Sequence, residues 1–165
     1  MRVLGIDPGS ICTGYGIVEE SAGKLRVVHW GSVHNNSKKD FPSRLKNIYD
    51  ELVAVIREFS PDSVAVEDMF FSNNARSALK LGQTRGVAIL SAVNENLTVT
   101  EYSPLEVKQS VVGYGRADKE QVRDMVTRLL NLKEKPEPFD ASDALAVAIC
   151  HLHISASNAR LKAAR

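Results

Sequence analysis

Four carboxylates stand where separate elements of secondary structure are expected to begin or end. Asp7 closes a short apolar run at 2–7, and Glu67 closes a second one at 63–67. Asp140 and Asp143 are three residues apart at the start of a late helical segment, so they share a helix face. Carboxylates brought together repel one another unless a cation neutralises them, and oxygen ligands without Cys or His suit Mg²⁺ or Mn²⁺. The pattern therefore favours two-metal phosphodiester chemistry.

Each of these carboxylates also has an ordinary structural interpretation. Asp7 precedes a Pro-Gly pair and fits a turn residue that bonds its own backbone. Asp140 and Asp143 fit an N-cap followed by an acid in the first helical turn. Glu67 at a strand end fits a simply solvated side chain. The joint placement of all four favours the metal site over four separate structural roles.

The elements that must position these acids follow from local patterns. Strand-like segments at 2–7, 14–19 and 25–33 are joined by short loops, which predicts an antiparallel meander. Beyond the meander, the spacing of apolar residues predicts helices and strands in alternation. The helices are expected over 42–59, 74–95, 104–112, 118–131 and 140–155, and the strands over 63–67 and 98–102.

This order predicts an α/β fold with a five-stranded mixed sheet and helices on both faces. The first crossover helix lays the fourth strand parallel to the first, on its free edge, which gives the strand order 3-2-1-4-5. The carboxyl ends of those two strands then lie side by side, where open sheets place their sites. One domain is expected over 1–155, followed by a basic, flexible tail at 156–165.

Composition excludes several classes of protein. The longest apolar run, 144–150, is far shorter than the about 20 residues that a membrane helix needs. An acid at position 7 interrupts any signal-peptide core, and two distant cysteines do not make a disulfide framework. A cytoplasmic protein without a membrane partner is expected. The net charge of +1, from 21 basic and 20 acidic residues, taken alone argues against a nucleic-acid binder, because such domains are often strongly basic.

Several motifs resemble the RuvC-type Holliday-junction endonucleases of bacteria. The acid-bearing motifs are GIDPGS at 5–10, AVE at 65–67 and DASDALA at 140–146. A fourth motif, TGYG at 13–16, closely follows the first. A short acid motif is shared with many ribonuclease-H-like enzymes. The stretches NARSALKLGQ at 74–83, RGVA at 85–88 and VKQSVVG at 107–113 are far more specific. The match covers the chain in order from near residue 2 to near residue 155.

The resemblance implies a ribonuclease-H-like fold, a homodimer and Mg²⁺-dependent nicking of two opposing strands of a four-way DNA junction, with Mn²⁺ as a substitute metal. It implies 5′-phosphate and 3′-hydroxyl ends, the RuvA–RuvB branch-migration complex as a partner, and a nucleoid-associated location. The family's catalytic and metal-binding acids, which would hold two ions, correspond to Asp7, Glu67, Asp140 and Asp143. Residues that handle DNA near the cut correspond to Phe70, Lys108 and Lys119, of which Lys119 is also a catalytic candidate.

The cations fall into two groups that suit a DNA backbone. Segment 72–94 carries Arg76, Lys80 and Arg85 and no acid, and Arg76 and Lys80 share a helix face. Lys108, Arg116 and Lys119 form a second group. Bound cations that neutralise the four acids would change the net charge to about +5. The alternative is that these are solvated helix faces. Similarly, Phe70 is expected to stack on an unpaired base unless both it and Phe71 are buried.

Two glycines stand inside the predicted helix at 74–95. Gly82 and Gly86 each cost about 1 kcal/mol of helix stability relative to Ala. Small residues four apart permit close packing, either on the sheet or against a second copy across a two-fold axis. The resemblance favours the dimer interface. By contrast, His151 and His153 diverge on a helix, so a metal shared between them is not expected.

Two other functions remain open. An actin-like ATPase also begins with Ile-Asp-x-Gly, although such enzymes need two lobes around the nucleotide and this chain is short. A non-catalytic junction-binding subunit would need the basic faces but not four acids. Nicking of a synthetic four-way junction with Mg²⁺ separates an enzyme from a binder.

Overall fold

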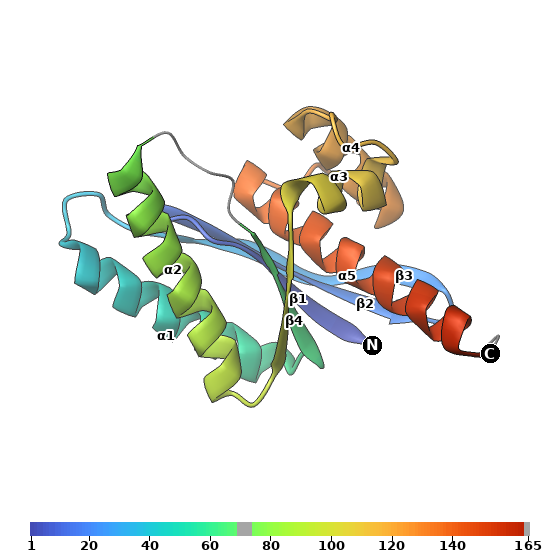
Figure 1. Cartoon of the computed structure of the whole chain (residues 1–165), viewed down its shortest axis with the longest axis horizontal. Helices are drawn as coiled ribbons and strands as arrows, with labels where there is room; N and C mark the ends of the chain where they lie inside the picture. Colours follow the sequence, from blue (N-terminus) through green and yellow to red (C-terminus); the bar gives the residue numbers. More distant parts are fainter. Residues whose placement is uncertain (69–73, 164–165) are drawn as a thin grey trace.

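The computed structural model describes residues 1–68 and 74–163, which form one five-stranded sheet with helices on both faces (Figure 1). The strands are β1 Arg2–Asp7, β2 Cys12–Ser21, β3 Lys24–His34, β4 Ser63–Glu67 and β5 Thr98–Tyr102. The helices are α1 Phe41–Phe59, α2 Ala75–Asn94, α3 Pro104–Val112, α4 Lys119–Leu129 and α5 Phe139–Ala163.

The sheet has the predicted order β3-β2-β1-β4-β5. β2 pairs antiparallel with both β1 and β3, whereas β4 pairs parallel with β1 and β5 pairs parallel with β4. The short turn at 21–24 forces the antiparallel hairpin, and helices α1 and α2 supply the crossovers that parallel strands need. This topology is the ribonuclease-H-like arrangement that the resemblance implies.

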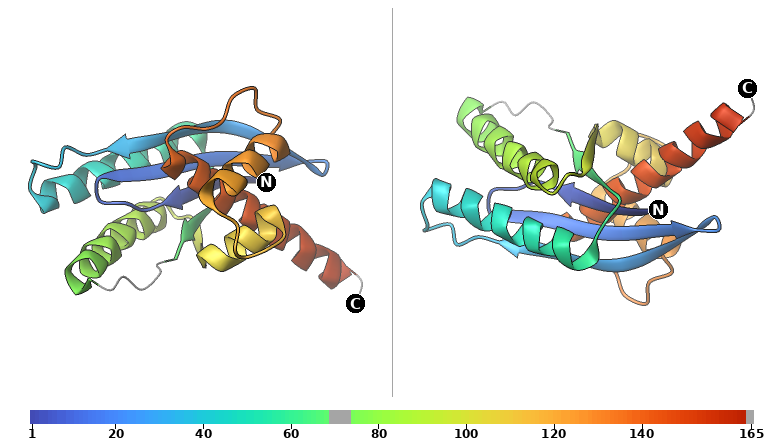
Figure 2. Two further views of the ribbon diagram at one scale, coloured as in Figure 1. Left: turned by 90° about the horizontal axis from the view of Figure 1, so that it is seen from above. Right: turned by 90° about the horizontal axis from the view of Figure 1, so that it is seen from below.

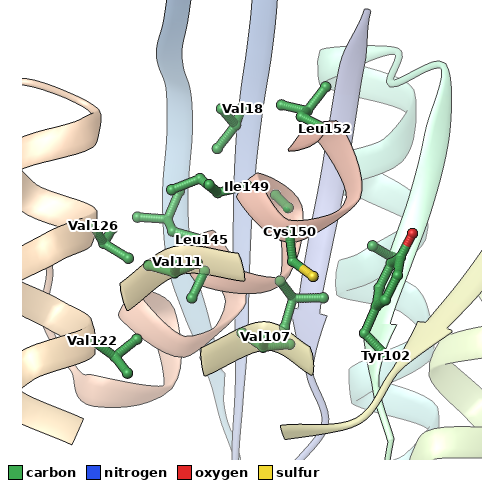
Figure 3. Packing of buried hydrophobic residues seen from close by; sticks show 14 of the residues in the cluster. Val18, Tyr102, Val107, Val111, Val122, Val126, Leu145, Ile149, Cys150 and Leu152 are labelled. Atoms are coloured by element: carbon green, nitrogen blue, oxygen red, sulfur yellow. The ribbon is translucent and has the colours of Figure 1, made fainter. Parts of the chain in front are cut away.

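Alternating residues of the central strands build a separate core on each face of the sheet. Leu4 and Ile6 of β1 pack toward helices α1 and α2, whereas Val3 packs toward helices α3, α4 and α5. Figure 2 shows these two helix layers from opposite sides. Figure 3 shows the second core, in which Leu145 and Ile149 of α5 lie among valines of α3 and α4. Because successive side chains of β1 point to opposite faces of the sheet, the strand contributes to both cores, and each core is covered by its own set of helices.

Helix α5 lies unusually close to the sheet because β1 and β2 carry glycines beneath it. A Cβ atom at Gly5 would lie 2.0 Å from the carbonyl oxygen of Ala144, and one at Gly14 would lie 1.9 Å from that of Asp140. No side chain fits at either place. The close contact brings the first turn of α5 down onto the carboxyl end of β1.

The end of α5 differs from the prediction. The sequence pattern predicts a helix that ends near residue 155 and a flexible tail, but α5 continues to Ala163. Ala and Leu favour the helical state there, and Arg160 and Lys162 in the last turn interact favourably with the helix dipole. The residues from 156 to 162 are exposed. Within 1–68 and 74–163, no helix is long and apolar enough to span a bilayer.

Candidate active site

Asp7 and Glu67 end two neighbouring parallel strands at the same level. The register pairs Ile6 with Val66, so the next residue of each strand is one of the two acids. Their carboxyl groups share a hydrogen bond. This juxtaposition is the one that the strand order predicts.

The two acids of α5 complete a group of four around Asp7. Burial, together with the charges of Glu67, Asp143 and Asp140, raises the pKa of Asp7 to about 8. Asp7 is therefore largely protonated at neutral pH, and its carboxyl group donates a hydrogen bond to Glu67. Asp140 lies inside the first turn of a helix that begins at Phe139, so its interpretation as an N-cap is wrong.

Glu67 has a mixed environment of acids and bases. Burial and the charge of Asp143 raise its pKa, while Asp7 and the cations of Lys119 and Lys108 act in the opposite direction. Lys108 comes from α3 and Lys119 is the first residue of α4. The structure thus brings both predicted lysines close enough to the acids to affect their ionisation.

Lys119 makes the most direct contact with the acid group. Its Nζ atom donates a hydrogen bond of 2.8 Å to Oδ2 of Asp143. Burial acts to lower the pKa of Lys119, but the hydrogen bond and charge of Asp143 outweigh it, so the pKa is raised. The ammonium group therefore stays charged beside the carboxylates, where it can hold a phosphate oxygen.

The carboxylates are paired with neighbours rather than arranged around a common point. Within the described residues, no three His, Cys, Asp or Glu side chains are grouped so that they would hold a metal ion as they stand. Asp7 is hydrogen-bonded to Glu67, and Asp143 accepts a hydrogen bond from Lys119. The donor set is nevertheless one of half-buried hard oxygen ligands, which is the chemistry that Mg²⁺ and Mn²⁺ select.

A cavity of about 200 Å³ opens beside Asp7 and Glu67 and is also lined by Arg85. Arg85 lies on α2 and pairs with Asp68 at 3.0 Å and with Glu101 of β5. The sequence places Arg85 in a segment without acids and therefore among cations for DNA. In the structure two carboxylates from outside α2 pair with Arg85, so it is not an unpaired cation for a DNA backbone. No local signal pointed to this pairing, which joins three separate elements.

Cys12 is a second contact that the sequence did not indicate. Burial and the neighbouring carboxylate of Asp140 raise the pKa of the Cys12 thiol to about 11, and the thiol is hydrogen-bonded to Asp140. The sulfur therefore stays a protonated donor to one of the four acids and is not a thiolate ligand.

The other predicted site residues lie on exposed surfaces or outside the described part. Arg76 and Lys80 of α2 and Arg116 before α4 are exposed. Phe70 and Phe71 lie outside the described residues. Gly82 is half-buried, whereas Gly86 is exposed and a Cβ atom there would meet nothing within 4 Å. Close packing on its own sheet therefore does not explain Gly86.

The two late histidines turn to different partners, as their spacing predicts. His151 is buried between the hydroxyl groups of Ser63 and Tyr102, at 3.3 Å and 3.0 Å. His153 contacts Ser110 of α3. Burial lowers the pKa of His151, so it is a neutral hydrogen-bonding residue of the core.

Comparisons with known proteins agree on one family. Residues 3–151 match the family model described as crossover junction endodeoxyribonuclease RuvC. A relative of that name from Pelobacter propionicus is 61% identical over 93% of this chain and 86% of its own length. Another, from Geobacter sulfurreducens, is 53% identical over the full length of both chains. The structure described as Thermus thermophilus RuvC in complex with Holliday junction substrate has a TM-score of 0.87 and 33% identity, over 95% of this chain and 96% of that one. The chain therefore belongs to the crossover junction endodeoxyribonuclease RuvC family.

Proposed function

We propose that this chain is a Mg²⁺-dependent endonuclease that resolves four-way DNA junctions by paired, symmetric nicks in opposing strands, leaving 5′-phosphate and 3′-hydroxyl ends. Membership of the RuvC family and the likeness to a junction-bound relative support the substrate. The observation that carries the chemistry is the convergence of Asp7, Glu67, Asp140 and Asp143 from two strands and one helix.

The four acids would hold the metal. Burial and their mutual repulsion together raise the pKa of Asp7, and a bound cation would offset both effects. Binding would require Asp7 to lose its proton and Asp143 to exchange Lys119 for the metal. Two Mg²⁺ ions, or Mn²⁺ in their place, would supply Lewis-acid activation of water and of the leaving oxygen.

Lys119 and Lys108 are proposed to hold the DNA at the cut. Both lie close enough to influence Glu67, and the ammonium group of Lys119 stays charged beside Asp143. Once released from Asp143, Lys119 can hold the phosphate that is attacked and stabilise the charge that develops on it. Phe70 follows Glu67 closely in the sequence, and we propose that it stacks on an unpaired base at the crossover.

The exposed face of α2 supports a homodimer. Leu79, Leu90 and Val93 are 70%, 50% and 52% exposed and lie on one helix face together with Gly86. An uncovered apolar stripe of this kind is typical of an interface, and Gly86 would permit two helices to approach closely. A two-fold dimer would present one acid group to each of two opposing strands.

The remaining cations are proposed to guide the arms of the junction. Arg76, Lys80 and Arg116 are exposed, and binding of metal at the acids would remove the opposing negative charge. Such a reaction takes place on chromosomal DNA, so we propose a cytoplasmic, nucleoid-associated location. The RuvA–RuvB branch-migration complex is the proposed partner that delivers the junction.

The deciding experiment incubates the purified chain with a synthetic four-way junction and Mg²⁺. Symmetric nicks in two opposing strands are expected, with ends that ligase can reseal without treatment. Asp7→Asn should bind the junction but not cut it. A gel shift without nicks from the wild-type chain would instead indicate a binding subunit, and thermal stabilisation by ATP would indicate the nucleotide-binding alternative. Either result would contradict the proposal.

A further inference from the structure

Arg44 is a buried cation in the first turns of α1. Arg44 is only 8% exposed. The buried Nε atom has no hydrogen-bond partner among the described residues, and no carboxylate of those residues forms an ion pair with the guanidinium group. Burying a charge without such a partner is unfavourable. An anionic partner from outside the chain would explain the arrangement.

A second cation converges on the same place. The guanidinium carbon of Arg44 lies 5.2 Å from the centre of the Phe41 ring, so the side chain turns back toward the start of α1. The Nζ atom of Lys80, from α2, lies 5.6 Å from the centre of the same ring. One aromatic ring thus holds a buried and an exposed cation from two helices.

The surrounding charges are mostly positive. Lys38 and Lys39 precede α1 and are exposed. The nearest acid in the sequence, Asp40, is the N-cap. Its carboxylate accepts hydrogen bonds from the backbone and the hydroxyl group of Ser43, which lower its pKa most, and the charge of Arg44 is a minor cause of the same shift. Neither α1 nor α2 has an acid in its first turn, whereas α3 and α4 carry Glu106 and Glu120 there. The start of α1 is therefore arranged for an anion.

The sheet topology places this group at the same end of the molecule as the acids. β1 and β3 both run antiparallel to β2, so β3 ends where β1 delivers Asp7, and α1 begins just beyond it. α2 follows β4, which ends at the same level. Figure 1 shows α1 and α2 starting on one side of the molecule. A polyanion that passes the acids can continue over the start of α1.

We propose that Arg44 and Lys80, gathered against the ring of Phe41, bind backbone phosphates of a duplex arm that leaves the active site. The guanidinium group offers the planar pair of donors that a phosphate accepts, and the ammonium group adds a point charge. The inference rests on the proposed function, because it assigns the anion to the DNA that is cut. It extends the DNA surface beyond the acids to a helix that the sequence did not implicate.

The test measures junction affinity over a range of KCl concentrations, in chelator so that no strand is cut. Lys80→Met, Arg44→Met and Arg44→Lys are compared with wild type on junctions with long arms and with arms cut back to the crossover. Lys24→Met is the matched control, because it removes an equal charge from the opposite end of the sheet. On long arms, Lys80→Met and Arg44→Met should bind several-fold more weakly, and the salt slope should fall by about 0.9 for each phosphate that is no longer neutralised.

On the short-arm junction, Lys80→Met and Arg44→Met should lose less affinity than on long arms, whereas Lys24→Met should bind as wild type does on both and, in Mg²⁺, nick at the wild-type rate. Arg44→Lys should recover part of the long-arm affinity. Wild-type affinity and salt slope for Lys80→Met on long arms would overturn the proposal, even if Arg44→Met fails to fold. Stabilisation of wild type, but not of Arg44→Lys, by inorganic phosphate alone would assign the site to a free anion and also overturn it. A wild-type chain that nicks neither junction would instead contradict the proposed function.

Discussion

The Nζ atom of Lys119 lies 2.8 Å from Oδ2 of Asp143, so the first residue of α4 is tied to the acid group on α5. The same lysine is close enough to act on Glu67, where its charge favours the ionised carboxylate and a lower pKa. One cation thus balances part of the charge of acids that come from two elements. This contact joins the two properties that an acid-based nuclease needs, a place for metal and a place for phosphate.

Replacement of Lys119 separates these two properties. Lys119→Met should lower the rate of junction nicking about 100-fold, the typical loss when one donor to the transition state is removed. Junction affinity should change little, because the remaining cations carry most of the backbone contacts. Single-turnover cleavage at saturating protein, with Lys133→Met as a surface control, checks this. An unchanged rate with weakened binding would make Lys119 a DNA contact only.

The raised pKa of Asp7 predicts a defined dependence of stability on pH. The folded pKa of about 8 lies above the ordinary value of 3.8, so the stability that the protonated carboxyl group contributes is lost as the pH rises from about 4 through 8. In chelator, Asp7→Asn should therefore melt at a higher temperature than wild type, by an amount that grows between about pH 4 and about pH 8. Each kcal/mol gained by removing this buried, repelled charge corresponds to about 2–4 °C in a domain of this size. Melting curves at several pH values measure it.

Metal removal gives the complementary result. Mg²⁺ should raise the melting temperature of wild type above that in chelator, because it binds only the folded acid group. Asp7→Asn should show little of this rise. Equal stabilisation of both proteins by Mg²⁺ would place the metal elsewhere.

The apolar stripe on α2 predicts how the oligomer can be broken. Leu90→Glu or Val93→Glu should give a monomer in light scattering, because a buried carboxylate at a two-fold axis also faces its own copy. Leu161→Glu is the control, since Leu161 is equally apolar and 66% exposed but lies on α5. A Leu90→Glu protein with the wild-type mass would exclude this face as the interface.

Arg85 is expected to hold the end of β4 in place. Arg85→Met leaves Asp68 and Glu101 without their shared partner, and the loss of these partly exposed pairs should cost about 1 kcal/mol of folding stability. The nicking rate should fall by more than this loss of stability alone would cause, because Asp68 directly follows the catalytic candidate Glu67 and Arg85 helps to hold that segment. Arg57→Met, which removes the ion pair with Glu95, should lower stability without affecting nicking. Equal nicking by both variants would show that Arg85 is not needed to position the acid.

Local sequence pattern was sufficient for the elements and their order. The short apolar runs of β1 and β4, the tight turn at 21–24 and the apolar spacing in α1 are near-neighbour properties, and each predicted element is present. The strand order followed because a short turn forces antiparallel pairing and a helix permits parallel pairing. Asp7 and Glu67 could be brought together by this reasoning alone, since both end neighbouring strands.

Tertiary structure decided which side chains are paired across elements. Arg85 is neutralised by acids that follow or belong to β4 and β5, whereas Arg44 is buried against Phe41 without an ion-pair partner among the described residues. The depth of α5 on the sheet, set by Gly5 and Gly14, likewise fixed the approach of Asp140 to Cys12. Periodicity along the chain determines which face a residue occupies, but charge pairing and burial depend on what distant segments place within a few ångströms of it.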